Sequence, residues 1–261
     1  MAVGRRALRR SVHRLTDLSH TCGYQSVDEA ERERRIRRVF AAVARRYDLM
    51  NDLMSRGIHR LWKRRLAKLA APVAGQVIVD LAGGTGDVAA LMAGADRRVL
   101  VCDPSVPMMA VGRERHMAHV GWLAGTGERL PLADASIDTL TIAFGIRNVT
   151  RLEDALAEAL RVLKPGGRFL CLEFSTPHML IRPFYNLFSF IVIPRLGAWV
   201  ARAPEAYQYL IESIRRFPDQ RAFAALIQRV GFEAVTHQNL SLGIACIHVG
   251  RKPQPAGAPS R

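Results

Sequence analysis

The sequence has few cysteines, and none is spaced as metal ligands or redox pairs usually are. Cys22, Cys102, Cys171 and Cys246 include no C-x-x-C pair, which argues against a zinc site and a disulfide framework. The last three lie inside apolar, strand-like runs, where cysteine behaves as a small buried hydrophobic residue. This usage predicts a reducing compartment.

Long hydrophobic runs are also absent. The 261-residue chain contains no uninterrupted apolar stretch of the ~18 residues that a membrane-spanning helix needs. Its length suits one large α/β domain or two small ones. We predict a single domain over residues 27–251, with an N-terminal helical region at 27–75 and a low-complexity, disordered tail at 252–261.

Acidic residues are scarce near the N-terminus. Residues 1–68 carry 18 Lys/Arg against 7 Asp/Glu, within a net charge of +15 for the whole chain. This basic region suits anionic lipid or nucleic acid, and arginine-rich solvated helices explain the same charge equally well. We predict that residues 1–26 form a disordered basic tail; an organelle presequence and a misplaced start are the alternatives.

Apolar periodicity predicts three helices over residues 27–46, 47–57 and 58–70. From residue 77 onward, short apolar strands alternate with helices, which predicts βαβ units and a mainly parallel sheet. The last two strands are joined by a short turn and predict an antiparallel hairpin at one edge. Strands are expected at 77–81, 98–102, 120–123, 137–143, 167–173, 232–237 and 243–249, and further helices at about 86–93, 105–118, 151–163 and 218–230.

A glycine-rich turn, DLAGGTG at residues 80–86, joins the first strand to a helix. Gly84 and Gly86 allow the backbone to turn tightly and to approach a ligand closely. The further glycine of the dinucleotide-binding pattern is missing, which argues against a nicotinamide oxidoreductase. Asp80, just ahead of the glycines, favours a cationic ligand such as S-adenosylmethionine over a pyrophosphate.

Asp103 ends the second strand, where an acid in a doubly wound sheet accepts hydrogen bonds from ribose hydroxyls. The alternative is that it caps the helix beginning near Ser105. Thr126 and Gly127 follow the third strand, where an adenine pocket is expected, and the KPGG run at 164–167 is interpreted as a structural turn. Together these features are typical of the class I S-adenosylmethionine-dependent methyltransferase fold, a Rossmann-like, doubly wound α/β sheet of seven strands.

Several stretches resemble one branch of that class, the ubiquinone/menaquinone biosynthesis C-methyltransferases (UbiE type). They are spread over residues 39–250 and comprise VFAAVARRYDLMNDLMSRGIHRLWK (39–63), VDLAGGTGD (79–87), AFGIRNV (143–149), RVLKPGGRFLCLEFS (161–175) and YQYLIESIRRFP (207–218). The resemblance implies methyl transfer from S-adenosylmethionine to a ring carbon of a polyprenylated benzoquinol or of demethylmenaquinol. It also implies that Thr85 and Asp103 contact the cofactor, with Thr126 and Gly127 beside the adenine. Ala143 stands where many members of the family carry serine.

A ring carbon is a weak nucleophile until the neighbouring hydroxyl loses its proton, so the site needs a base and a stabiliser of the phenolate. Arg147 cannot act as a base but suits the second role, and Asn148 could orient an acceptor oxygen or a water. An ion pair with an acid such as Asp154 is the structural alternative for Arg147. The proton would pass to a water or to a group of the N-terminal helices, where the candidates are Tyr47, Asp48, Asn51 and His59. Asp48 and Asn51 are equally well explained as helix caps, and His59 as a structural histidine.

Residues 183–217 begin with an apolar, aromatic-rich stretch that predicts a lid over a lipid-like substrate; ordinary helix packing or a dimer contact would also explain it.

The expected partners are the quinol, a membrane surface, other quinone-biosynthesis proteins and a second copy of the chain, with no nucleic acid. We expect a cytoplasmic protein, peripheral at the inner membrane face, rather than one of the mitochondrial matrix. The rival hypotheses are a methyltransferase acting on RNA or a small metabolite, and a non-catalytic membrane-surface scaffold.

Overall fold

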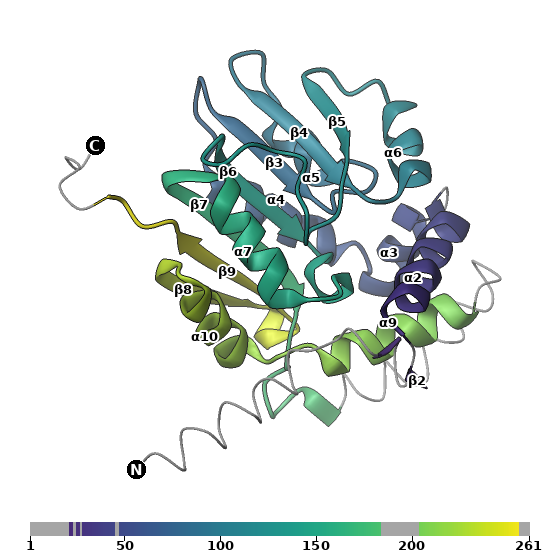
Figure 1. Ribbon diagram of the computed structural model, residues 1–261. Coiled ribbons are helices and arrows are strands. Elements are labelled where there is room, and N and C mark those ends of the chain that lie inside the picture. Colours follow the sequence, from purple (N-terminus) through teal and green to yellow (C-terminus); the bar gives the residue numbers. More distant parts are fainter. Residues whose placement is uncertain (1–20, 23–24, 27, 45–46, 184–203, 256–261) are drawn as a thin grey trace, which may run out of the picture.

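A seven-stranded sheet forms the centre of the computed structural model, which describes residues 21–22, 25–26, 28–44, 47–183 and 204–255 (Figure 1). The strand order is β5-β4-β3-β6-β7-β9-β8. All neighbours run parallel except β9, which is antiparallel to both β7 and β8. The predicted doubly wound sheet with an antiparallel edge hairpin is confirmed. The strands are β3 (Val77–Leu81), β4 (Arg98–Asp103), β5 (Val120–Ala124), β6 (Ile137–Ala143), β7 (Leu163–Phe174), β8 (Glu233–Leu240) and β9 (Ala245–Arg251).

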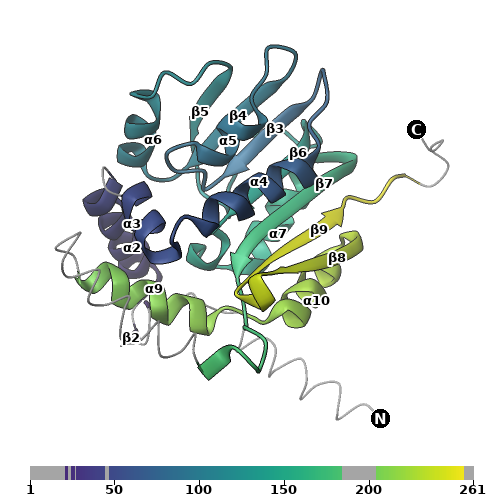
Figure 2. The same cartoon turned by 180° about the vertical axis from the view of Figure 1, so that it is seen from behind.

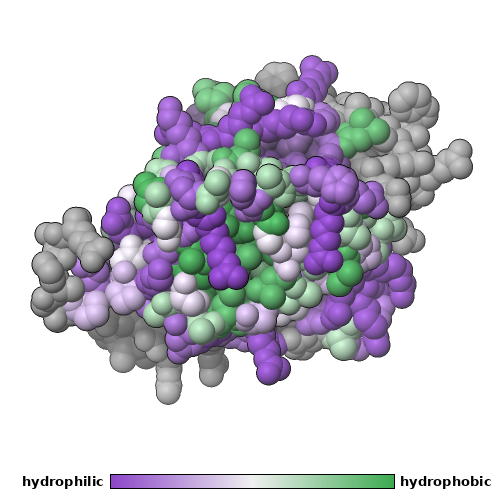
Figure 3. Space-filling model, turned by 90° about the horizontal axis from the view of Figure 1, so that it is seen from above, coloured by the Kyte–Doolittle hydropathy of each residue, from purple (hydrophilic) through white to green (hydrophobic). Residues whose placement is uncertain are grey.

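Helices cover both faces of the sheet, as Figures 1 and 2 show from opposite sides. On one face α7 (Leu152–Val162) and α10 (Gln220–Val230) pack on a core that includes Val79 and Leu81 of β3. On the other, α4 (Ile58–Ala70), α5 (Asp87–Met92) and α6 (Val106–Arg113) pack around Ile78. Successive strand residues point to opposite faces, so a strand such as β3, which is apolar except for Asp80, fits a sheet buried on both sides. Seen from above, apolar residues show between projecting hydrophilic side chains (Figure 3).

The N-terminal helices α2 (Glu29–Val43) and α3 (Tyr47–Ser55) lie beside α9 (Pro204–Arg216), as both ribbon views show. Within the segment predicted to be a disordered tail, β1 (Thr21–Cys22) pairs antiparallel with β2 (Gln25–Ser26), so these four residues differ from that prediction. The first part of the predicted lid, residues 184–203, lies outside the described residues, as does most of the predicted C-terminal tail. Among the described helices, none combines the length and hydrophobicity needed to span a bilayer.

Two expected boundaries are wrong. The run at 164–167 was expected to be a turn ahead of a strand, but it lies inside β7: Leu163 pairs with Ile137, and pairing resumes between Arg168 and Thr139. The extra residues form an irregularity of the bulge type, with Gly166 in the left-handed region at φ +75°. Helix α6 ends at Arg113, five residues short of the predicted end at 118.

Candidate active site

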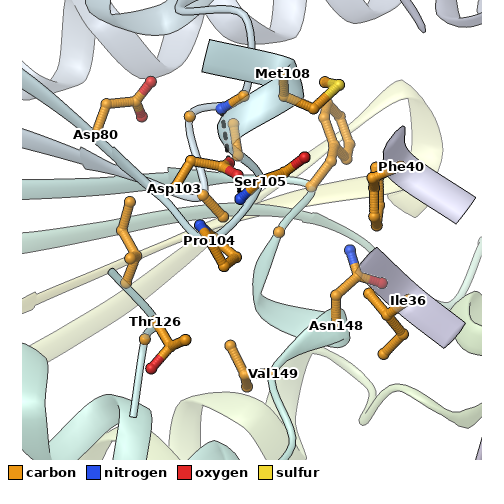
Figure 4. A pocket seen from close by; sticks show the side chains of 18 of the residues that line it. Ile36, Phe40, Asp80, Asp103, Pro104, Ser105, Met108, Thr126, Asn148 and Val149 are labelled. Atoms are coloured by element: carbon orange, nitrogen blue, oxygen red, sulfur yellow. Dashed lines mark hydrogen bonds between the residues drawn. The ribbon is translucent and has the colours of Figure 1, made fainter. Parts of the chain in front are cut away.

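A cavity lies at the carboxyl ends of β3, β4 and β6, the edge at which open α/β sheets bind ligands. Its volume is about 1150 Å³ when the open solvent at its mouth is included. Figure 4 shows the side chains around it, with Ile36 and Phe40 of α2 facing the strand ends. Of the predicted cofactor residues, those that line it are Asp80, Gly84, Thr85, Asp103, Thr126, Gly127 and Ala143.

Asp80 presents a buried oxygen that has no hydrogen-bond partner among the described residues. Its Oδ1 accepts a hydrogen bond from Thr141 Oγ1 at 2.8 Å, and its Oδ2 is the atom left over. Burial raises the pKa of this carboxyl to about 7. A Cβ on Gly83 would lie 2.7 Å from Oδ2, so only a glycine leaves room for this buried oxygen. The residue therefore fits the cationic ligand that the sequence predicted.

Asp103 lines the cavity and also orders the backbone around it. The N–H of Gly84 donates to its Oδ2 at 2.8 Å, and the N–H of Ser105 donates to its Oδ1 at 2.7 Å (Figure 4). The Asp103 carboxylate therefore binds the residue that precedes α6 and also lines the cavity. Burial raises the pKa of Asp103 to about 6. Ser105 Oγ is buried without a partner in the described part of the chain, a polar group that the sequence did not single out.

Gly86 differs from its predicted role because it does not line the cavity. It precedes α5 with φ +85°, and a Cβ there would lie 2.7 Å from Met117 Cε and 3.0 Å from the ring of Trp122. Its contribution is to let the turn pack against these side chains. Gly127, by contrast, lines the cavity, and a Cβ there would lie 3.2 Å from Val149 Cγ1.

Asp48, one of the candidate bases, belongs to a chain of charges beside the glycine turn. Its Oδ1 accepts from Thr85 Oγ1 at 3.3 Å, and its Oδ2 forms an ion pair with Arg115. Arg115 also pairs with Asp87 at 2.9 Å, which Lys63 Nζ contacts at 3.0 Å. The Asp48 side chain is therefore held by two donors and is not among the cavity-lining residues.

His59 lies on α4 and does not line the cavity. The side chain is buried, and its Nδ1 is 2.7 Å from Ser55 Oγ. Burial and the neighbouring Lys63 lower its pKa. These contacts favour the structural alternative over the role of a base. Tyr47 begins α3, but its side chain lies outside the described residues.

The AFGIRNV stretch turns sharply at the end of β6. Phe144 has φ +57°, uncommon for a residue other than glycine and often associated with functional sites. A Cβ on Gly145 would lie 2.5 Å from Ala82 Cβ, so the end of β6 and the glycine turn are in close contact. Phe144 also packs on Trp62 and Phe174, with ring centroids 6.1 Å and 4.7 Å away.

Arg147 does not face the cavity as expected. Its side chain is buried, and Nη1 donates to the carbonyl of Phe144 at 2.6 Å and to Glu173 Oε1 at 2.7 Å. The suggested ion-pair partner Asp154 is wrong as well, because it pairs with Arg151. Glu173 is the penultimate residue of β7, which neighbours β6 in the sheet, so Arg147 Nη1 bridges the turn after β6 and the end of β7. Asn148 is the member of the pair that lines the cavity.

The comparisons with known proteins agree with this geometry. Residues 28–252 match the model of the ubiE/COQ5 methyltransferase family. The chain belongs to this family. A relative from Rubrivivax gelatinosus, named ubiquinone/menaquinone biosynthesis C-methyltransferase UbiE, is 73% identical over 92% of this chain and 96% of its own length. Another relative of that name, from Methylobacterium nodulans, is 52% identical over 88% of this chain and 95% of its own length.

Solved structures share the fold at low sequence identity. A possible histamine N-methyltransferase from Thermotoga maritima superposes with a TM-score of 0.60 at 22% identity, covering 82% of this chain and 99% of that one. Phosphoethanolamine N-methyltransferase 2 of Haemonchus contortus, solved in complex with S-adenosyl-L-methionine, gives a TM-score of 0.56 at 16% identity. That similarity covers 74% of this chain and 52% of the other. These similarities support the class I methyltransferase fold alone.

Proposed function

We propose that this protein transfers the methyl group of S-adenosylmethionine to a ring carbon of a polyprenylated quinol in ubiquinone or menaquinone biosynthesis, or in both. Family membership and the names of the relatives support the reaction class. The observation that carries the proposal is that two buried carboxylates, Asp80 and Asp103, share one cavity with an apolar wall formed by Ile36 and Phe40 of α2 (Figure 4).

S-Adenosylmethionine supplies a methyl group on a positively charged sulfur when bound. We assign Asp80 Oδ2, which lacks a partner among the described residues, to accept from the ammonium group, and Asp103 to accept from the ribose hydroxyls. Thr126 and Gly127 line the part of the cavity assigned to the adenine. Thr85 and Ala143 complete the wall around the glycine turn and the end of β6.

Asn148, Ile36 and Phe40 line the side assigned to the acceptor ring (Figure 4). Asn148 would hold the ring oxygen next to the reacting carbon and stabilise its negative charge by hydrogen bonding. We assign Arg147 to the support of this turn through Glu173, instead of direct contact with the oxygen. Because His59 is off the cavity and Asp48 is paired with Arg115, we assign proton removal to a water molecule, with Tyr47 as the remaining side-chain candidate.

A polyprenyl tail partitions into lipid, so the reaction is placed at the cytoplasmic face of the inner membrane, with peripheral association of the protein. The predicted domain organisation is part of the same proposal, in which residues 183–217 form a lid over the polyprenyl tail of the substrate. Other proteins of quinone biosynthesis and a second copy of the chain are the proposed partners.

The direct test is incubation with methyl-labelled S-adenosylmethionine and short-chain benzoquinol and naphthoquinol acceptors under reducing conditions, followed by mass analysis. We expect the label on a ring carbon of one or both quinols. The Asn148→Ala variant should bind S-adenosylhomocysteine normally while turning over about 10²-fold more slowly, the effect of losing one donor to a developing oxyanion. Labelling of RNA or protein alone would disprove the quinol assignment.

The affinity for S-adenosylmethionine should increase with pH through the titration of Asp80. Its pKa of about 7 means that the carboxyl is protonated below neutrality, where it cannot pair with an ammonium group. The dissociation constant is therefore expected to fall by up to about tenfold per unit between pH 5.5 and 7 and to level off above. In Asp80→Asn, calorimetry should show weaker binding with a remaining midpoint near the pKa of Asp103, about 6. An unchanged midpoint in the variant would exclude Asp80 as the titrating group.

A further inference from the structure

Tyr209, on α9, contacts the residue assigned to hold the acceptor oxygen. Its hydroxyl donates a hydrogen bond to Asn148 Oδ1 at 3.0 Å, and its side chain is buried. We infer that Tyr209 is a positioning residue that turns the Asn148 amide so that its N–H group points at the methyl acceptor. This inference rests on the proposed function, in which Asn148 binds the oxygen next to the reacting carbon.

The argument begins with the two ends of the asparagine amide. Its oxygen only accepts hydrogen bonds, and its NH₂ group only donates them. With Oδ1 held by the Tyr209 hydroxyl, the NH₂ group is left to donate elsewhere; Figure 4 shows its nitrogen on the side of Phe40, which also lines the cavity. An N–H donor suits an acceptor oxygen that becomes a phenolate, whereas a flipped amide would present an oxygen to that negative charge.

The main chain of Asn148 is already fixed by other groups. The buried Arg32 of α2 donates through Nη1 to the Asn148 carbonyl at 3.0 Å and to Thr150 Oγ1 at 3.1 Å. The Asn148 N–H donates to the Gly145 carbonyl at 3.0 Å. The orientation of the side-chain amide is then left to be fixed, and within the described part of the chain its oxygen accepts a hydrogen bond from the Tyr209 hydroxyl. Two helices far apart in the sequence, α2 and α9, therefore act on the same asparagine.

The test is the variant Tyr209→Phe, which removes the hydroxyl and keeps the ring. We expect kcat to fall about tenfold, the factor expected for losing one neutral hydrogen bond. The KM for S-adenosylmethionine and the affinity for S-adenosylhomocysteine should stay within about twofold of the parent, because no cofactor-lining residue changes. Ser213→Ala is the matched control: it removes a hydroxyl from the same helix, one that donates to the Leu210 carbonyl, and should leave kcat unchanged.

A double-mutant cycle separates positioning from general support of the fold. In the Asn148→Ala background, Tyr209→Phe should lower kcat by less than about twofold, because the group it orients is gone. A full tenfold loss in that background, or a normal kcat for Tyr209→Phe alone, would overturn the role of Tyr209. A normal kcat for Asn148→Ala would instead refute the role of Asn148 in the proposed reaction, and the inference about Tyr209 with it.

Discussion

Replacing Glu173 by alanine is expected to lower the free energy of unfolding by about 3–5 kcal/mol, because it removes the buried carboxylate that pairs with the guanidinium of Arg147. The pair is 2.7 Å apart, with side chains only 5% and 1% exposed. Glu173 also accepts from the backbone N–H groups of Phe174 and Arg147, and these would lose their partner. Urea unfolding followed by circular dichroism measures the change.

The matched control is Glu153→Ala, which breaks the more exposed ion pair with Arg229 and should cost less than about 1 kcal/mol. A loss of similar size in both variants would contradict the special role of the buried pair. The double variant Glu173→Leu with Arg147→Met removes both charges at similar volume and should recover much of the stability. If its methyl transfer recovers too, Arg147 only supports the turn; if turnover stays low, the positive charge itself contributes to the reaction, as the sequence first suggested.

Substitution of Asp103 by alanine should raise the dissociation constant for S-adenosylmethionine at least about 10²-fold. The carboxylate is proposed to accept from both ribose hydroxyls, and hydrogen bonds to a charged group contribute about 1.5–3 kcal/mol each. The variant also removes the acceptor of the Gly84 and Ser105 N–H groups, so the glycine turn loses support. Isothermal titration calorimetry near pH 7.5, where the native carboxyl is ionised, gives the constants.

Asp138→Ala provides the comparison for this measurement. Asp138 also accepts from a backbone N–H, that of Val77, and pairs with Lys164, but it lies at the opposite end of the sheet. Its loss should reduce stability while leaving cofactor affinity unchanged. Equal weakening of binding by the two variants would mean that Asp103 acts through the fold and not through the ribose.

The part of the cavity assigned to the cofactor was predictable, because the residues that line it are close together in the sequence. A strand, a glycine turn and a second strand ending in an acid lie within residues 77–103, and the known edge of a parallel sheet brings Asp80 and Asp103 together. Gly86 shows the limit of the pattern, because a glycine can be required by packing against Trp122 as well as by a ligand.

The acceptor half was harder to predict because its contacts join distant parts of the chain. The partner of Arg147 is Glu173, 26 residues away on the adjacent strand, and only the strand register identifies it. The apolar periodicity of residues 27–46 predicted a helix there, but not that Ile36 and Phe40 of this helix would form a wall of the cavity. Tyr209 lies within a quoted family stretch, yet nothing local links it to Asn148, 61 residues earlier.

The two tryptophans within the described residues flank the two turns that form the site. Trp62 packs edge-on against Phe174 and contacts Phe144, which begins the turn after β6. The ring of Trp122 lies against Gly86 and Gly112, behind the glycine turn. Indole emission depends on the polarity and packing around the ring, so each turn has a built-in fluorophore. Single-tryptophan variants would therefore let fluorescence report ligand binding at each of the two turns separately, without an added dye.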